Sequence, residues 1–216
     1  MRASFVRAPL AALGAQATPA GQALAVLRVP GENPAAAVVL TDLSPFARTG
    51  FKGADTPDWL GRHGLAIPAQ PNQAVVQADG SLLARLSMGE FLLLARPGDE
   101  MGLVERLDAA WSWGDGAGLC FPLPRQESHA WFHLRGAAVP EMMAKLCGVD
   151  LRRHVFADGA LAQTSVARLN AIVIRQGDDF HLLADSASAE YLWECVTDAM
   201  AEFGGSVAGA NHLLAA

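Results

Sequence analysis

Positive charge is scarce in this sequence of 216 residues. Lys and Arg together number 16 against 22 Asp and Glu, so the formal net charge is −6 at pH 7. The few basic residues are scattered along the chain. A nucleic-acid-binding surface needs clustered cations that neutralise phosphates. We therefore expect no nucleic-acid partner.

Long apolar runs are also missing. No segment approaches the roughly 20 residues that cross a bilayer, so we expect no membrane contact and a cytoplasmic location. Ala15-Gln16-Ala17 resembles a secretory cleavage site, but the apolar stretch before it is short and interrupted by Pro9. The sequence also contains no disulfide framework that would favour export.

Cysteine is sparse and unpatterned. Cys120, Cys147 and Cys195 are odd in number, lie in apolar stretches and are too widely spaced for a metal-binding pattern. We expect buried reduced thiols and no metal site. His129 and His133 do not change this expectation, because four residues along a strand separate their Cα atoms by roughly 13 Å.

Local catalytic signatures are absent too. The sequence contains no Gly-x-Ser-x-Gly, Cys-x-x-Cys or His-Glu-x-x-His motif. The glycine-rich segment 114–118 neither follows a clear strand nor opens a helix, so we interpret it as a linker. Asp178 and Asp179 occupy a predicted hairpin turn, where adjacent side chains usually point apart into water. We therefore expect no catalytic residue.

A large core is present, since 51% of the residues are hydrophobic. Periodicity predicts strands, helices and hairpins in one order that occurs twice. In the first half the elements are strands at 36–40 and 46–52, a short helix from Thr56, a hairpin of 82–86 with 90–95, and a helix from Met101 to Trp111. In the second half they are a strand at 129–135, a short helix at 140–146, a hairpin of 171–176 with 180–184, and a helix at 188–203.

The repeat extends to individual residues. Gly53-Ala54 matches Gly136-Ala137 before each short helix, and Phe91–Ala95 matches Phe180–Ala184. We predict an α+β fold of two similar split βαβ, ferredoxin-like halves that pack together. The expected divisions are an irregular N-terminal arm with at most one short strand (1–35), a first half (36–113), a second half (119–205) and a flexible tail (206–216).

The strand at 129–135 has one polar and aromatic face. Trp131, His133 and Arg135 share this face, and Ala130, Phe132 and Leu134 share the other. Trp and Arg are enriched where interfaces bind most tightly, so the first three are our candidate exposed contact surface. The alternative is an ordinary half-solvated sheet face.

An ordered series of short segments resembles the sarcosine oxidase gamma subunits. The series runs from about Thr41 to Gly205, and no single motif in it is diagnostic. Its members are Thr41–Pro45, Arg48–Gly53, Ala66–Pro68 with Pro71-Asn72, Leu86–Leu94, Asp178–Leu182 and Tyr191–Trp193.

The resemblance implies the folate-binding fold of the glycine-cleavage T-protein and a non-catalytic role beside alpha, beta and delta type subunits. The complex would oxidatively demethylate sarcosine to glycine and pass the one-carbon unit to tetrahydrofolate. The FAD, FMN and NAD would reside on the partner subunits.

This sequence departs from the T-protein pattern where folate would be bound. Leu82 and Leu83 stand where paired aspartates are expected, and Gln176-Gly177 stands where a Gly-Glu pair would supply a carboxylate to the pterin ring. A carboxylate makes the stronger, charge-assisted hydrogen bond. The Lys-Gly-Cys-Tyr-type motif of stand-alone folate-binding relatives is absent as well. Tetrahydrofolate nevertheless stays a possible ligand of this chain.

Two alternatives remain open. One is a T-protein-like aminomethyltransferase or demethylase with rearranged acids. The other is a stand-alone folate or small-ligand binding module, for which Arg168, Asn170 and Arg175 would be the binding residues.

Overall fold

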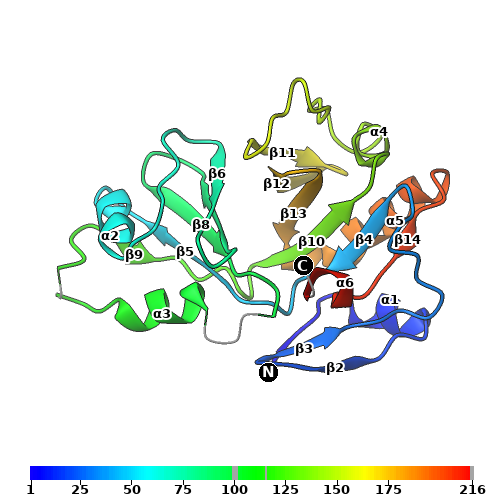
Figure 1. Ribbon diagram of the computed structural model, residues 1–216, viewed down its shortest axis with the longest axis horizontal. Helices are drawn as coiled ribbons and strands as arrows, with labels where there is room; N and C mark the ends of the chain where they lie inside the picture. Colours follow the sequence, from blue (N-terminus) through cyan, green and yellow to red (C-terminus); the bar gives the residue numbers. More distant parts are fainter. Residues whose placement is uncertain (99–101, 115, 215–216) are drawn as a thin grey trace. The chain divides into compact units, whose positions relative to one another are not determined.

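The computed structural model describes residues 1–98, 102–114 and 116–214 and has a mixed α+β architecture with three sheets and a few mostly short helices (Figure 1). Two compact units divide the chain. The first comprises Met1–Phe46 with Ser128–Ala216, and the second comprises Ala47–Glu127. Residues 36–46, which the sequence assigns to the first half, thus lie in the same unit as the strand at 129–135.

A six-stranded sheet forms the centre of the first unit, in the order β11-β12-β13-β10-β4-β14. Neighbouring strands are antiparallel, except that β14 runs parallel to β4. The strands are β4 (Val39–Asp42), β10 (His129–Arg135), β11 (Leu161–Val166), β12 (Leu169–Gln176), β13 (Asp179–Asp185) and β14 (Ser206–Val207).

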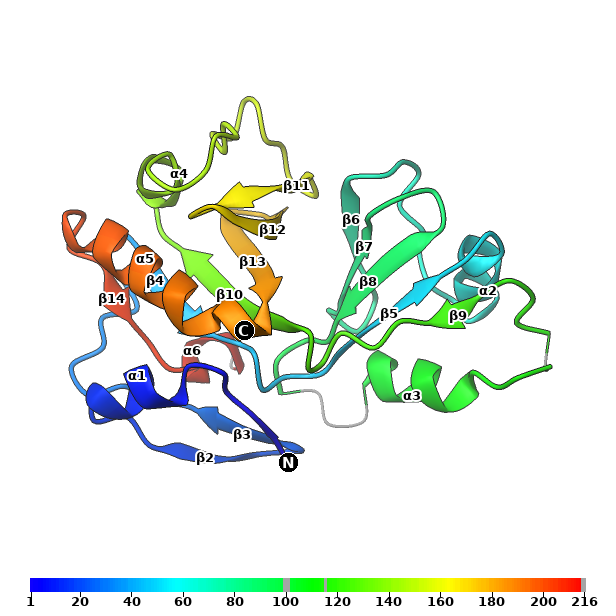
Figure 2. The same cartoon turned by 180° about the vertical axis from the view of Figure 1, so that it is seen from behind.

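The core of this unit lies on one face of that sheet. Ala130, Phe132 and Leu134 of β10 point into it, as their alternation predicts. Helix α5 (Ala189–Ala201) adds Leu192 and Val196 and crosses the sheet, as seen from behind in Figure 2. The short helices α4 (Val139–Met143) and η1 (Ser186–Ser188) follow β10 and β13.

The N-terminal residues are more ordered than an irregular arm. They form a three-stranded sheet of β1 (Arg2–Ala3), β3 (Ala23–Val26) and β2 (Ala17–Ala20), together with helix α1 (Arg7–Ala12). The described part of the expected tail is hydrogen-bonded as well. Ala210 N donates to Val26 O at 2.9 Å, and the short helix α6 (Asn211–Leu214) follows.

The second unit contains a five-stranded sheet in the order β6-β7-β8-β5-β9, whose neighbouring strands are antiparallel. Its core includes Phe51, Leu60, Phe91 and Leu107. The strands are β5 (Arg48–Lys52), β6 (Gln73–Val76), β7 (Leu82–Arg85), β8 (Glu90–Leu94) and β9 (Phe121–Pro122), and the helices are α2 (Thr56–Arg62) and α3 (Leu103–Ala110).

Both predicted hairpins and the strand at 129–135 are confirmed, and the predicted helices are present with shifted ends. The predictions missed β6, β9, β11 and β14, the last of which lies in the expected tail. Met101 of the expected 101–111 helix and Asp115 of the expected linker lie outside the described residues. Within the described residues, no helix is both long and apolar enough to span a membrane.

The two glycines that the sequence pairs have matching surroundings. Gly53 and Gly136 both have positive φ, +145° and +127°. A Cβ on Gly53 would lie 1.8 Å from Leu119 O, and one on Gly136 would lie 2.2 Å from Ala37 O. Each position therefore admits only glycine, because a side chain would collide with the neighbouring backbone.

We predict that Gly136→Ala lowers the free energy of unfolding by about 2–3 kcal/mol, because the added methyl group forces the Ala37 backbone to move. Urea unfolding followed by circular dichroism measures the effect. Gly148→Ala is the matched control, since a Cβ there has no neighbour within 4 Å. Equal stability of both variants would contradict the close approach.

Candidate functional site

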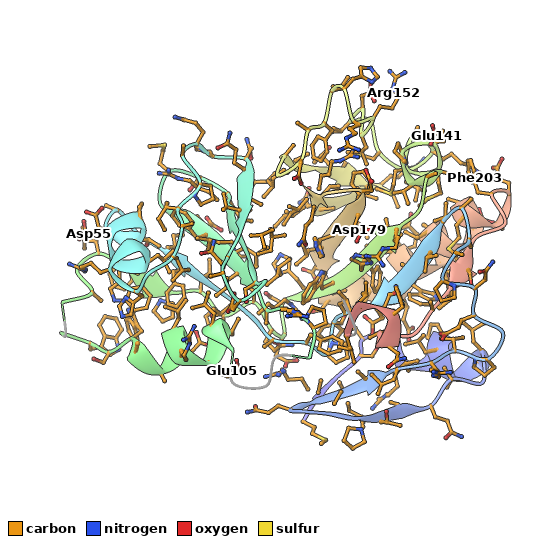
Figure 3. All side chains as sticks on the ribbon, viewed as in Figure 1. Asp55, Glu105, Glu141, Arg152, Asp179 and Phe203 are labelled. Atoms are coloured by element: carbon orange, nitrogen blue, oxygen red, sulfur yellow. The ribbon has the colours of Figure 1, made fainter. Side chains whose placement is uncertain are left out.

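A group of polar side chains occupies the face of the six-stranded sheet opposite its core. They come from the central strands β10 and β13, in which His133 lies opposite His181. We name this set the His–Asp cluster, and its members are Trp131, His133, Arg135, Asp179 and His181. Figure 3 labels Asp179 beside these strands.

Asp179 joins the two strands through charge. Arg135 donates to both carboxylate oxygens, from Nε to Oδ1 at 2.8 Å and from Nη2 to Oδ2 at 2.6 Å. His133 Nε2 lies 3.3 Å from Oδ2. Burial opposes ionisation of Asp179, but the hydrogen bonds from Arg135 and His133 outweigh it and hold the pKa of Asp179 well below its usual range. The hydrogen bond to Asp179 likewise raises the pKa of Arg135.

His181 occupies the middle of a hydrogen-bonded chain. Trp131 Nε1 donates to His181 Nδ1 at 3.0 Å, and His181 Nε2 lies 2.8 Å from Gln176 Oε1. An indole nitrogen only donates, so Nδ1 accepts and Nε2 carries the hydrogen that Gln176 receives. Burial, and secondarily the charge of His133, lower the pKa of His181 to about 3. At neutral pH this imidazole is therefore uncharged.

Some polar atoms in the cluster and beside it have no hydrogen-bond partner among the described residues. Thr41 Oγ1 and His133 Nδ1 are buried and have no hydrogen-bond partner among the described residues. The two residues lie directly opposite each other on β4 and β10. His212 Nε2, on α6, is also unpartnered, and the charges of His133 and Arg135 contribute to the lowered pKa of His212, after burial.

The cluster is poorly suited to acid–base catalysis. Asp179 is held ionised by two partners, and His181 uses both ring nitrogens at neutral pH. His133 Nδ1 has no partner among the described residues, but the residue is only 3% exposed. A general acid or base needs a pKa near the working pH and a free atom that reaches the substrate. Among the described residues, no group of three or more His, Cys, Asp or Glu side chains could hold a metal ion.

The expectation of an exposed Trp131–Arg135 surface is wrong for two of its three residues. Trp131 is 1% exposed and His133 is 3% exposed. Their polar atoms contact β13, because the neighbouring side chains of β13 on this face, Asp179 and His181, are also polar. Arg135 is partly exposed, with 37% of its side chain accessible.

The structure does not bring Arg168, Asn170 and Arg175 together. Arg168 is exposed in the turn between β11 and β12, with φ of +67°. Asn170 is exposed, whereas Arg175 is buried on the opposite face of β12. Five residues along a strand separate the last two by roughly 16 Å.

Arg175 serves the fold. Its guanidinium donates to the carbonyl oxygens of Gly177, Leu151 and Phe156 at 2.7–3.3 Å and lies over the Phe180 ring. Asn170 lines a shallow groove of about 330 Å³ with His129 and Gln163. A second groove, of about 680 Å³, lies at the turn beside the cluster and includes Arg135 and Arg175.

The sequence reasoning missed Asp179 and His181. It placed both Asp178 and Asp179 in water, but only Asp178 is exposed, at 78% of its side chain, against 19% for Asp179. Alternation along 179–185 could have found them. In the antiparallel pair of β10 with β13, Asp179-x-His181 faces His133-x-Arg135 once the register is known.

We predict that Asp179→Asn lowers the free energy of unfolding at pH 7 by about 2 kcal/mol, since it weakens two charge-assisted hydrogen bonds. The folded pKa lies below the unfolded value of about 3.9, so this stabilisation is present above pH 4 and is lost as pH falls further. Urea unfolding at pH 7, 5 and 3.5 should show the gap between wild type and variant shrinking at the lowest pH. Asp198→Asn, at an exposed position of α5, is the control. A gap independent of pH would contradict the pairing.

The lowered pKa of His181 makes the stability of the fold sensitive to acid. The unfolded chain binds a proton at His181 near pH 6.5, whereas the folded chain binds it only near pH 3. Stability therefore falls as pH drops through this window, by about 1.4 kcal/mol per pH unit at most. His181→Gln, whose amide donates and accepts without titrating, should lose less stability than wild type between pH 6.5 and 4. His154→Gln, at an exposed position, should follow wild type.

No protein-family model matches the chain. The sarcosine oxidase subunit gamma of Corynebacterium sp. (strain P-1) is 28% identical over 141 residues, which are 65% of this chain. The match spans 66% of that relative, slightly less than two thirds of its length.

Two solved structures share the fold. A chain of the heterotetrameric sarcosine oxidase from Corynebacterium sp. U-96, in complex with pyrrole 2-carboxylate, matches with a TM-score of 0.69 and 20% identity, over 93% of this chain and 95% of that one. The glycine cleavage system aminomethyltransferase T from Bartonella henselae matches with a TM-score of 0.73 and 15% identity, over 98% of this chain and 60% of that one. The resemblance to sarcosine oxidase gamma subunits is therefore confirmed, and the chain has the mixed α+β fold of these two solved proteins.

Proposed function

We propose that this chain is the non-catalytic gamma-type subunit of a heterotetrameric sarcosine oxidase. The observation that carries the proposal is the agreement of two matches: a curated gamma subunit in sequence, and a sarcosine oxidase chain that the fold covers almost from end to end. Alpha, beta and delta type subunits would be its partners and would hold FAD, FMN and NAD. The cytoplasmic location stays a prediction from the sequence.

The geometry of the His–Asp cluster supports a role without chemistry of its own. Its charged and neutral groups stabilise each other across β10 and β13. Leu82 and Leu83, at the positions of the expected aspartates, are buried in β7 at 3% and 0% exposure. An aminomethyltransferase reaction would need acids from elsewhere in the chain.

The position that would supply a carboxylate to the pterin ring of folate also carries an uncharged residue. Gln176 occupies that position, and its Oε1 accepts a hydrogen bond from His181. A pterin would have to compete for this oxygen. We therefore assign folate chemistry to the partner subunits.

We also infer that the two large sheets descend from one duplicated unit with residues 36–113 and 119–205 as its copies. The order β6-β7-β8-β5-β9 corresponds to β11-β12-β13-β10-β4. In the five-stranded sheet, β5 and β7 are parallel and the antiparallel strand β8 lies between them. In the six-stranded sheet, β10 and β12 are parallel and β13 lies between them. A short helix follows the first strand of each parallel pair. That arrangement is a split βαβ unit.

The proposed copies exchange their first strands. β4, the first strand of the first copy, pairs with β10 of the second copy. β9, the first strand of the second copy, pairs with β5 of the first copy. The equivalent surroundings of Gly53 and Gly136 support the correspondence, since each glycine abuts the backbone just before the exchanged strand.

Purification of a tagged copy from the native host tests the proposed function. We expect the chain to co-elute with larger subunits, a flavin absorption spectrum and sarcosine-dependent oxygen consumption. A colourless chain that elutes alone and binds a reduced folate would contradict the proposal and favour a stand-alone binding module.

A further inference from the structure

The groove of about 680 Å³ beside the His–Asp cluster lies where three neighbouring strands begin or end. Gln176, the last residue of β12, pairs with Asp179, the first residue of β13. Arg135, at the end of β10, donates to Asp179 from the other side. The three side chains therefore form one row across the sheet, because paired residues of antiparallel strands point to the same face. Gly136 and Pro140, near the start of α4, line the groove as well.

The hydrogen-bonded chain through His181 fixes which way the amide of Gln176 points. Trp131 Nε1 can only donate, so His181 Nδ1 accepts and His181 Nε2 carries a hydrogen. Gln176 offers its oxygen to that hydrogen, since Gln176 Oε1 lies 2.8 Å from His181 Nε2. The amide nitrogen of Gln176 is thus not used by His181 and has two hydrogens to donate.

Arg135 offers a further donor at the same groove. Its Nε and Nη2 donate to the two carboxylate oxygens of Asp179, which leaves Nη1. Neither Arg135 Nη1 nor Gln176 Nε2 has a hydrogen-bond partner among the described residues. Both residues are partly exposed, and neither atom is among the buried unpartnered atoms, so both donors are open to solvent.

The carboxylates that line the groove are already engaged. Arg135 donates to both oxygens of Asp179. Asp178 Oδ1 lies 3.2 Å from Arg153 Nη1 and 3.3 Å from Arg175 Nη2. The open donors, rather than unpaired charge, therefore decide what the groove can bind. They are complementary to a ligand that has lone pairs and no hydrogens of its own to offer.

We propose that this groove binds a small oxyanion, a carboxylate or a phosphate, through Arg135 Nη1 and Gln176 Nε2. An oxyanion has lone pairs for both donors, and its hydrogen bond to the guanidinium is charge-assisted and therefore strong. A pterin ring suits the groove less well, because its N–H groups need an acceptor and Gln176 Oε1 is taken by His181. The inference does not depend on the proposed function.

The test titrates the isotope-labelled full chain with succinate and with inorganic phosphate at constant ionic strength. NMR follows the side-chain amide of Gln176 and the Nε–H of Arg135, and thermal stability is recorded for each protein. Dimethyl succinate, which is uncharged, is the ligand control. Gln176→Glu keeps an oxygen for His181 and replaces the donor by an acceptor. Gln163→Glu, the matched control, places the same charge at an exposed position of β11 outside this groove.

We expect saturable shifts at both groups with at least one of the two anions, and the anion that binds more tightly identifies the class of ligand. Gln176→Glu should weaken binding about tenfold or more, because it removes a donor and adds like charge, whereas Gln163→Glu should bind as wild type does. Absence of saturable shifts at both groups would overturn the inference. Equal binding of dimethyl succinate, or equal weakening by the two variants, would also overturn it. If Gln176→Glu fails to fold, the wild-type titration still decides.

Discussion

The strict alternation of β10 decides how both faces of the six-stranded sheet are used. Its even-numbered residues form the core with α5, and its odd-numbered residues meet polar partners from β13. A shift of the register by one residue would place Arg135 and His133 in the core, where their charge and hydrogen-bonding groups would lack partners. The pairing of Arg135 with Asp179 therefore specifies the register as well as stabilising it.

Hydrophobic periodicity was enough to predict the strong elements. The hairpins around residues 87–89 and 177–178 and the long helix α5 have clear patterns and clear turn or end signals. The missed strands have weaker signals. β9 contains Pro122, which argues against a strand, and it exists because its partner β5 supplies the hydrogen bonds.

The candidate site was predictable only in part, because strand pairing is not visible in the sequence. The sequence identifies Trp131, His133 and Arg135 as one face, but it does not show which strand lies beside β10. Only the register places Asp179 and His181 against them, and that pairing turns a supposed surface into a buried network. Arg175 was a candidate binding residue in the sequence, but it is buried and donates to backbone carbonyls. That structural role has no local sequence signal.

The account rests on the proposal that this chain is a gamma-type subunit of a sarcosine oxidase complex. The central claim is most directly tested by native mass spectrometry of the sarcosine-oxidising complex purified from the host, with a deletion of this chain alongside. The account predicts one copy of this chain bound to three different larger or smaller partner chains, and an incomplete complex in its absence. An active complex that forms fully without this chain would contradict it.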